Sequence, residues 1–145
     1  LREVPECELL IVGAGNGHKV LKLDHLPGVQ VVGYVPNLPE VISGSAISVA
    51  PLRFSAGIQF KVVESMAAGL PVITTSSVSA GLGTEPGRDL LVADSANDFA
   101  RQVVSLLKDE GLRWRLGQAG RVYVQSHISL QGAIDRLRAI EDLIA

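Results

Sequence analysis

The stretch of residues 50–75 decides the fold class and reads APLRFSAGIQFKVVESMAAGLPVITT. An apolar run ends at Pro51, a glycine-containing loop follows, and a helix is predicted to begin near Gln59. Gly69 ends this helix, because glycine readily adopts the left-handed conformation that often follows a helix. Pro71 then starts a new apolar run, since proline is tolerated at the first residue of a strand. The pattern predicts a strand, a loop, a helix and a second strand in succession.

The predicted helix is amphipathic and begins directly after the loop. At helical spacing, its apolar face comprises Val62, Val63, Met66 and Ala67, and its opposite face comprises Lys61, Glu64, Ser65 and Ala68. The backbone N–H groups at a helix N-terminus suit an anion, especially a phosphate. Lys61 adds a positive charge, and Glu64, one turn deeper, can accept hydrogen bonds from sugar hydroxyls. This arrangement indicates a nucleotide-sugar diphosphate site. The alternative is a solvated Lys61–Glu64 pair, which would contribute only about 0.2–0.5 kcal/mol.

The rest of the chain alternates between predicted strands and helices. Apolar runs predict strands at 8–12, 29–35, 46–50, 72–75 and 89–93, and helical periodicity predicts helices at 19–26, 38–43, from Ser95, at 112–126 and from Ser129. A long loop is expected over 76–88. Strands that alternate with helices, without hairpins, favour a parallel α/β sheet of the Rossmann-like kind with a helical C-terminus. We expect one domain over residues 1–145.

Composition excludes several classes of protein. The formal net charge of −2 gives no electrostatic reason to expect a nucleic-acid partner. Apolar runs are too short to span a bilayer, and the sequence does not open with a secretory leader, so a cytoplasmic protein is expected. Cys7 is the only cysteine and is expected to pack as a small core residue.

Residues 64–72 resemble the donor-site signature of family 4 retaining glycosyltransferases, which have the GT-B fold. That signature is a glutamate, seven residues, a second glutamate, a run of small residues and Gly-x-Pro-Val. Glu64 matches the second glutamate, whose counterparts bind the donor ribose hydroxyls. The first glutamate would fall at Ala56, so this chain departs from the pattern and lacks that contact to the donor sugar.

One branch of this family carries Pro-Leu-Arg, a glycine-containing loop and a lysine, and the present chain is similar to it. The resemblance implies that Arg53, Lys61 and the N–H groups near Gly57 and Ile58 meet the diphosphate. The family generally works without a metal, and no Asp-x-Asp pair occurs here. His18, His25 and His127 also lack metal-ligand spacing. Neither a metal nor another cofactor is therefore expected.

Two further segments resemble the family near the nucleotide. Gly13 and Gly15 follow the first predicted strand, as in a Val-Gly-x-Gly turn that borders the donor site. Gly33-Tyr34-Val35 resembles a Gly-x-Val segment whose backbone contacts the nucleobase, although Tyr34 is equally consistent with packing at the end of a strand. The glycines also invite a dinucleotide interpretation, but the third glycine of that motif would fall at His18.

The resemblance covers only the C-terminal, donor-binding domain, so the N-terminal acceptor domain is expected elsewhere in a longer parent enzyme, for which a membrane-peripheral location is one expectation. The family's first strand and helix of this domain would precede Leu1. Either the strands close up, or another chain fills the gap, or the natural protein is longer. The chain alone is expected to be inactive. Two alternatives stay open: a non-catalytic module that pairs through its incomplete sheet, including with itself, and a dinucleotide-binding domain of an oxidoreductase.

Overall fold

The computed structural model describes residues 3–14, 17–54 and 57–128 and divides the chain into two units. Unit 1 comprises residues 1–41, and unit 2 comprises residues 42–145. The strands pair in parallel, as the sequence predicts for an α/β protein, but they form two sheets, one in each unit, where a single sheet was expected. The predicted helix that begins at Ser129 lies outside the described residues.

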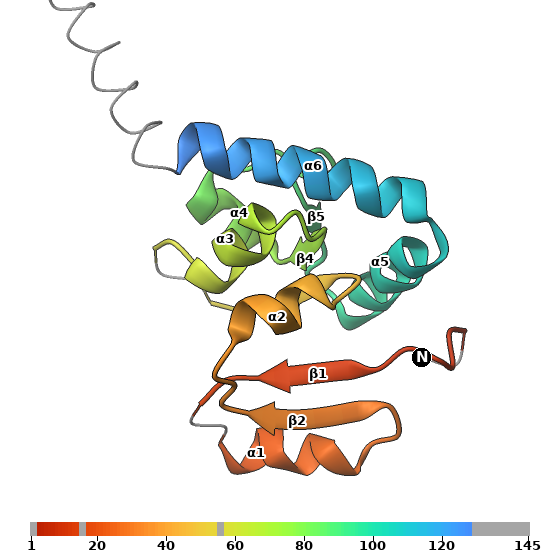
Figure 1. Ribbon diagram of the computed structural model, residues 1–145. Coiled ribbons are helices and arrows are strands. Elements are labelled where there is room, and N and C mark those ends of the chain that lie inside the picture. Colours follow the sequence, from red (N-terminus) through yellow and green to blue (C-terminus); the bar gives the residue numbers. More distant parts are fainter. Residues whose placement is uncertain (1–2, 15–16, 55–56, 129–145) are drawn as a thin grey trace, which may run out of the picture. The chain divides into compact units, whose positions relative to one another are not determined.

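Unit 1 is a strand–helix–strand unit (Figure 1). Its elements are β1 (Leu9–Val12), α1 (His18–Leu21), the 3-10 helix η1 (Lys22–His25) and β2 (Val29–Gly33). The two strands pair in parallel. Asp24 in η1 accepts a hydrogen bond from the backbone N–H of Val31 at 2.7 Å, which occupies one backbone donor of β2 that β1 does not use.

Unit 2 contains a three-stranded parallel sheet in the order β3-β4-β5. Helix α2 (Leu38–Ser43) contains the boundary between the units. The elements that follow it are β3 (Ser48–Ala50), α3 (Phe60–Ala67), β4 (Val72–Thr74), α4 (Ser76–Leu82), β5 (Leu91–Val92), α5 (Ala96–Lys108) and α6 (Glu110–His127). Each pair of neighbouring strands is therefore joined by a helix, which parallel pairing requires.

The middle strand β4 is covered on both faces, because its alternate side chains enter two different hydrophobic clusters. Val72 packs with residues of α3, α4 and α6, whereas Ile73 packs with Leu106 of α5 and Leu116 of α6. All three side chains of β4, including Thr74, are completely buried. A continuous apolar run, rather than an alternating one, is typical of such a strand.

Helix α6 begins beside α5 and runs across α3 in unit 2 (Figure 1). The contact is close because two buried glycines of α6, Gly117 and Gly120, face it. A Cβ on Gly120 would lie 2.9 Å from the carbonyl oxygen of Asp89 and 3.5 Å from the side chain of Met66. Small residues therefore set the distance between α6 and the layer below.

The structure corrects the expectation of a loop over residues 76–88. Residues Ser76–Leu82 form helix α4, which ends at Gly83 with φ +72°. Serine and glycine disfavour a helix locally, but Val78 and Leu82, one turn apart, are buried in the core. Packing of this apolar pair outweighs the weak propensity.

Two smaller expectations were also wrong. Ser65 was placed on the outer face of the central helix and Ala67 on its inner face, yet Ser65 is only 4% exposed and Ala67 is exposed. The helix predicted to begin at residue 112 begins instead at Glu110, with Gly111 in its first turn, and Asp109 as the N-cap accepts a hydrogen bond from the N–H of Leu112 at 2.8 Å. The predicted cap at Ser95 is confirmed.

Candidate functional site

The loop between β3 and α3 leaves the sheet at the carboxyl end of β3, the edge at which ligands bind in parallel α/β sheets. Of the predicted site residues, Arg53, Gly57 and Ile58 lie on this loop, and all three are exposed. Gly57 has φ +71°, a conformation that favours glycine. The loop therefore ends in a turn whose backbone suits glycine at the point where α3 begins.

The N-terminus of α3 keeps backbone donors available. The N–H groups of Val62 and Val63 both donate to the carbonyl of Gln59, at 2.9 and 3.2 Å. Among the described residues, the N–H groups of Phe60 and Lys61 have no acceptor. Gln59 does not cap them with its side chain. This end of α3 is thus suited to an anion.

Lys61 and Glu64 both project from α3 with exposed side chains. No ion pair joins them within the part of the chain that the structure describes. The alternative of a Lys61–Glu64 surface pair is therefore not what the structure contains. Both charges remain available to a ligand on the solvent side of α3.

Local sequence patterns did not reveal two sets of hydroxyls that anchor helix α3 and the start of the β3–α3 loop. Ser65 donates to the carbonyl of Lys61 at 2.9 Å, and its oxygen lies 2.9 Å from the hydroxyl of Ser48 in β3. Thr74 and Thr75, at the end of β4, donate to the carbonyls of Ala50 at 2.9 Å and Leu52 at 2.7 Å. Hydroxyls on the strands thus fix both α3 and the start of the loop, and no local sequence pattern signals such long-range partners.

Gly13 and Tyr34, the other predicted site residues that the structure describes, lie in unit 1. Gly15 lies outside the described residues. Gly13 (φ +147°) and Gly33 (φ +75°) terminate the two strands, and the N–H of Gly13 donates to the carbonyl of Gly33 at 2.8 Å. Tyr34 is 75% exposed. Its exposure argues against the alternative that this ring packs at the end of the strand.

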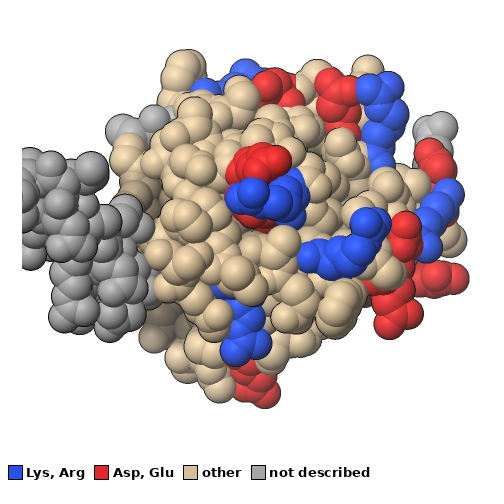
Figure 2. Space-filling view, turned by 90° about the horizontal axis from the view of Figure 1, so that it is seen from above, with Lys and Arg blue, Asp and Glu red and all other residues tan. Residues whose placement is uncertain are grey.

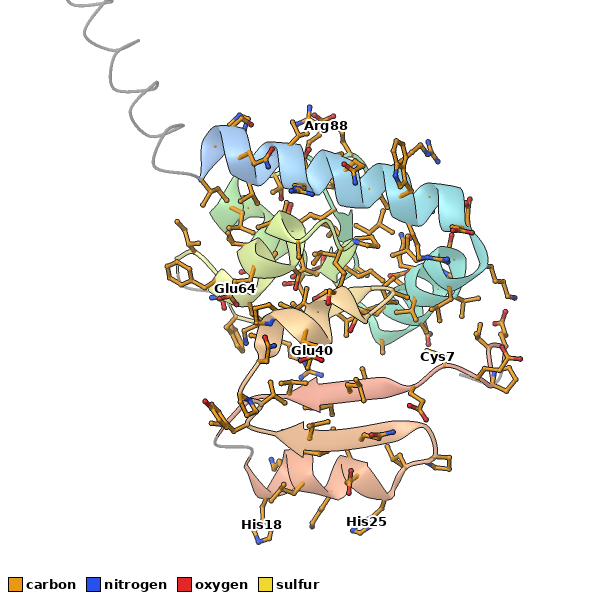
Figure 3. The ribbon with its side chains drawn as sticks, in the orientation of Figure 1. Cys7, His18, His25, Glu40, Glu64 and Arg88 are labelled. Carbon is orange, nitrogen blue, oxygen red and sulfur yellow. The ribbon has the colours of Figure 1, made fainter. Side chains whose placement is uncertain are left out.

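Two hollows in unit 2 lie elsewhere, between α6 and the turn before β5. They enclose about 320 and 170 Å³, and neither is lined by Arg53, Lys61 or Glu64. Figure 3 shows Arg88, which lines both, beyond α6 and on the far side of that helix from Glu64.

Arg88 has a structural role at this turn. It donates to the buried carboxylate of Asp89 at 2.8 and 3.1 Å and forms an ion pair with Glu85. The hydrogen bond to Asp89 raises the pKa of the Arg88 guanidinium above its ordinary value. Its charge is therefore already neutralised within the protein.

The face shown in Figure 2 carries acidic and basic side chains interspersed among wide neutral areas. Among the described residues, no cluster of three or more His, Cys, Asp or Glu side chains is arranged to hold a metal ion. In the same part of the chain, no helix combines the length and the apolar character needed to cross a bilayer.

Comparison with known proteins places this chain in a family. The sequence model of the family described as glycosyl transferases group 1 matches residues 1–109. A relative from Corynebacterium glutamicum, the GDP-mannose-dependent monoacylated alpha-(1-6)-phosphatidylinositol monomannoside mannosyltransferase, is 28% identical over 94% of this chain. The chain spans only 39% of the length of that relative.

Solved structures share the fold. HepE of Anabaena, in complex with UDP, superposes with a TM-score of 0.71 at 14% identity, over 86% of this chain and 39% of that one. The C-terminal domain of the group 1 glycosyl transferase LpcC from Francisella tularensis superposes with a TM-score of 0.63 at 17% identity, over 86% of this chain and 88% of that one.

The family match covers most of the chain and overrides the alternative of an oxidoreductase domain. The chain belongs to the group 1 glycosyl transferases and has the fold of the C-terminal domain of a GT-B glycosyltransferase.

Proposed function

We propose that this chain is the donor-binding part of an enzyme that transfers a sugar from a nucleoside diphosphate to an acceptor, with retention of configuration, as in family 4. Membership of the group 1 glycosyl transferases supports this proposal. The proposal includes an N-terminal acceptor domain elsewhere in the protein, because the chain spans 39% of its relative from Corynebacterium glutamicum. We also propose that residues 1–145 belong to one domain.

The observation that carries the proposal is the grouping of complementary donors at one helix end. Within the described part of the chain, the N–H groups of Phe60 and Lys61 have no acceptor, and the exposed ammonium of Lys61 lies at the same end of α3. The exposed Arg53 lies on the loop that leads from β3 to this helix end. In the proposed complex they bind the diphosphate, together with the loop backbone at Gly57 and Ile58. Donors fixed in this way stabilise the negative charge that develops on the leaving diphosphate when the glycosidic bond breaks.

Glu64 supplies the other end of the site. Its exposed carboxylate lies one helical turn beyond Lys61 and has no partner in the described part of the chain. A carboxylate accepts hydrogen bonds only, which suits the two hydroxyls of a ribose. Gly13, Gly15 and Tyr34 are proposed to border the nucleoside, and a metal is not required.

Isothermal titration of the full-length protein with UDP and GDP tests the site. The two nucleotides are chosen because HepE binds UDP and the Corynebacterium relative is named for GDP-mannose. Glu64→Ala is expected to weaken the preferred nucleotide about tenfold or more, since a charged hydrogen bond is worth about 1.5–3 kcal/mol. Lys61→Gln is expected to weaken binding of the nucleoside diphosphate more than binding of the free nucleoside.

Matched controls come from α6, where Glu110 and Arg121 are exposed charges. Glu110→Ala and Arg121→Gln are expected to leave nucleotide binding unchanged. A full-length protein that binds no nucleotide would contradict the proposed function, and sedimentation would then test the interaction-module alternative. Binding that survives Glu64→Ala unchanged would refute the site while leaving the function standing.

A further inference from the structure

We propose that Thr75 is a positioning residue for the diphosphate-binding loop. This inference rests on the proposed function, because it concerns how Arg53 is presented to the donor. Thr75 does not lie on the loop. It follows β4 and is only 8% exposed, and its hydroxyl donates to the carbonyl of Leu52 at 2.7 Å. Arg53 is the next residue along the chain.

The hydroxyl of Thr75 is diverted from its usual local role. Thr75 is the N-cap of α4, a position where a threonine side chain ordinarily accepts a hydrogen bond from the helix backbone. Here it makes no such bond. The N–H of Ser76 instead donates to the carboxylate of Asp94 at 2.9 Å. With Asp94 serving the helix start, the threonine hydroxyl is left to hold the loop.

The bond to Leu52 is the second of two that define how the chain leaves β3. The carbonyl of Ala50 accepts both the Thr74 hydroxyl at 2.9 Å and the N–H of Leu52 at 2.8 Å, which closes a tight turn. Ala50 and Thr74 are also partners in the parallel ladder. Thr74 therefore fixes the end of the strand, whereas Thr75 fixes the first residue pair beyond it.

The far end of the loop lies near the same helix. A Cβ added to Gly81 of α4 would lie 3.5 Å from the carbonyl oxygen of Gly57, so little more than a methyl group would fit between α4 and the loop there. The N-cap of α4 bonds to the loop at Leu52, and the helix lies close to the loop again at Gly57. Arg53 lies between these two points in the chain.

Substitution of Thr75 in the full-length protein separates positioning from general stability. Thr75→Val keeps the shape of the side chain and removes the donor, so the partly buried carbonyl of Leu52 loses this hydrogen bond and the start of the loop is released. We expect binding of UDP or GDP, whichever the wild type prefers, to weaken about tenfold. Binding of the corresponding monophosphate, which lacks the outer phosphate, is expected to change less than about twofold. Thr75→Ser is expected to restore wild-type affinity, and Thr75→Cys, a weak donor, to lie between.

The control is Thr84→Val, which removes another buried hydroxyl, bonded to Ser79 at 2.8 Å and remote from Arg53 in sequence. It is expected to lower stability without changing the ratio of diphosphate to monophosphate affinity. The inference is overturned if Thr75→Val weakens the binding of the diphosphate and the monophosphate equally, or weakens neither. It is also overturned if Thr75→Ser binds them as Thr75→Val does. If Thr75→Val does not fold, Thr75→Ser and Thr75→Cys are compared instead. An equal ratio of diphosphate to monophosphate affinity in these two variants would also overturn the inference. A wild-type protein without nucleotide affinity contradicts the proposed function instead.

Discussion

Gly117 of α6 lies so close to Gly69 that a Cβ at position 117 would be 2.0 Å from the Gly69 carbonyl oxygen. Gly69 follows α3 with φ +82°, and its carbonyl is backbone that cannot rotate aside. The end of α3 and the middle of α6 are therefore in direct backbone contact. Helix α3 also carries Lys61 and Glu64, so this contact positions the helix of the candidate site as well as stabilising the fold.

Gly117→Ala is expected to destabilise the protein by about 3 kcal/mol, because α6 must move away from α3 to admit the methyl group. The measurement is the midpoint of urea unfolding. Gly111→Ala, in the first turn of the same helix, is the matched control. A Cβ there meets only the side chain of Asp109 at 3.4 Å. Its stability is expected to be unchanged or to rise by up to about 1 kcal/mol. Equal effects in the two variants would contradict the close contact.

Tyr123→Phe is expected to lower the free energy of unfolding by about 1 kcal/mol. The Tyr123 hydroxyl donates to the carbonyl of Leu82 at 2.6 Å in the buried contact between α6 and α4. Removing the hydroxyl leaves that carbonyl without this donor. Tyr34→Phe, at a ring that is 75% exposed, is expected to have no measurable effect. A stability loss at Tyr34 equal to that at Tyr123 would show that the buried bond is not the cause.

Ser95→Ala is expected to raise the pKa of Asp98. The Ser95 hydroxyl donates to the Asp98 carboxylate at 2.6 Å and, with Arg101, holds the pKa of that carboxyl below its ordinary value. Because the folded pKa is lowered, the stabilisation is present above the ordinary pKa of an aspartate and is lost as the pH falls through the folded value. NMR titration of the Asp98 carboxyl measures the change.

The same substitution removes the N-cap of α5, since Ser95 also accepts from the N–H of Asp98 at 3.1 Å. At neutral pH we expect a loss of about 1 kcal/mol in unfolding free energy. Ser105→Ala, in the exposed interior of the same helix, should cause no loss. An Asp98 pKa that does not move in Ser95→Ala would mean that the hydroxyl does not stabilise the charged carboxylate.

Local sequence signals predicted most of the elements because they act within one turn or one strand. Gly69 ends α3 and has positive φ, and Ser95 caps α5, both as expected from their own chemistry. The strand at β4 was expected from the apolar run that follows Pro71, and its burial on both faces was seen only in the structure. Helix α4 was missed because its local propensity is weak, although the spacing of Val78 and Leu82 and the stop at Gly83 were readable signals.

The residues of the candidate site can likewise be divided into those predicted from the sequence and those identified only in the structure. The motif around Glu64 was sufficient to indicate the glycosyltransferase resemblance. Lys61 was predicted from its charge and its place at the helix start, and Arg53 from the resemblance of Pro-Leu-Arg to one branch of the family. The structure then showed that Lys61 and Glu64 do not pair with each other, a fact that depends on side-chain placement. It also revealed Ser65 and Thr75, whose partners lie 17 and 23 residues away.

By itself, the sequence determined the alternation of strands and helices, the family resemblance and the charges available to a ligand, because periodicity, turn chemistry and short motifs are local properties of the chain. Only the tertiary structure decided which hydroxyls hold the loop, which serines are buried and how closely α6 approaches α3. Those outcomes depend on contacts between residues far apart in the chain, and they are set by packing rather than by the preference of any one residue.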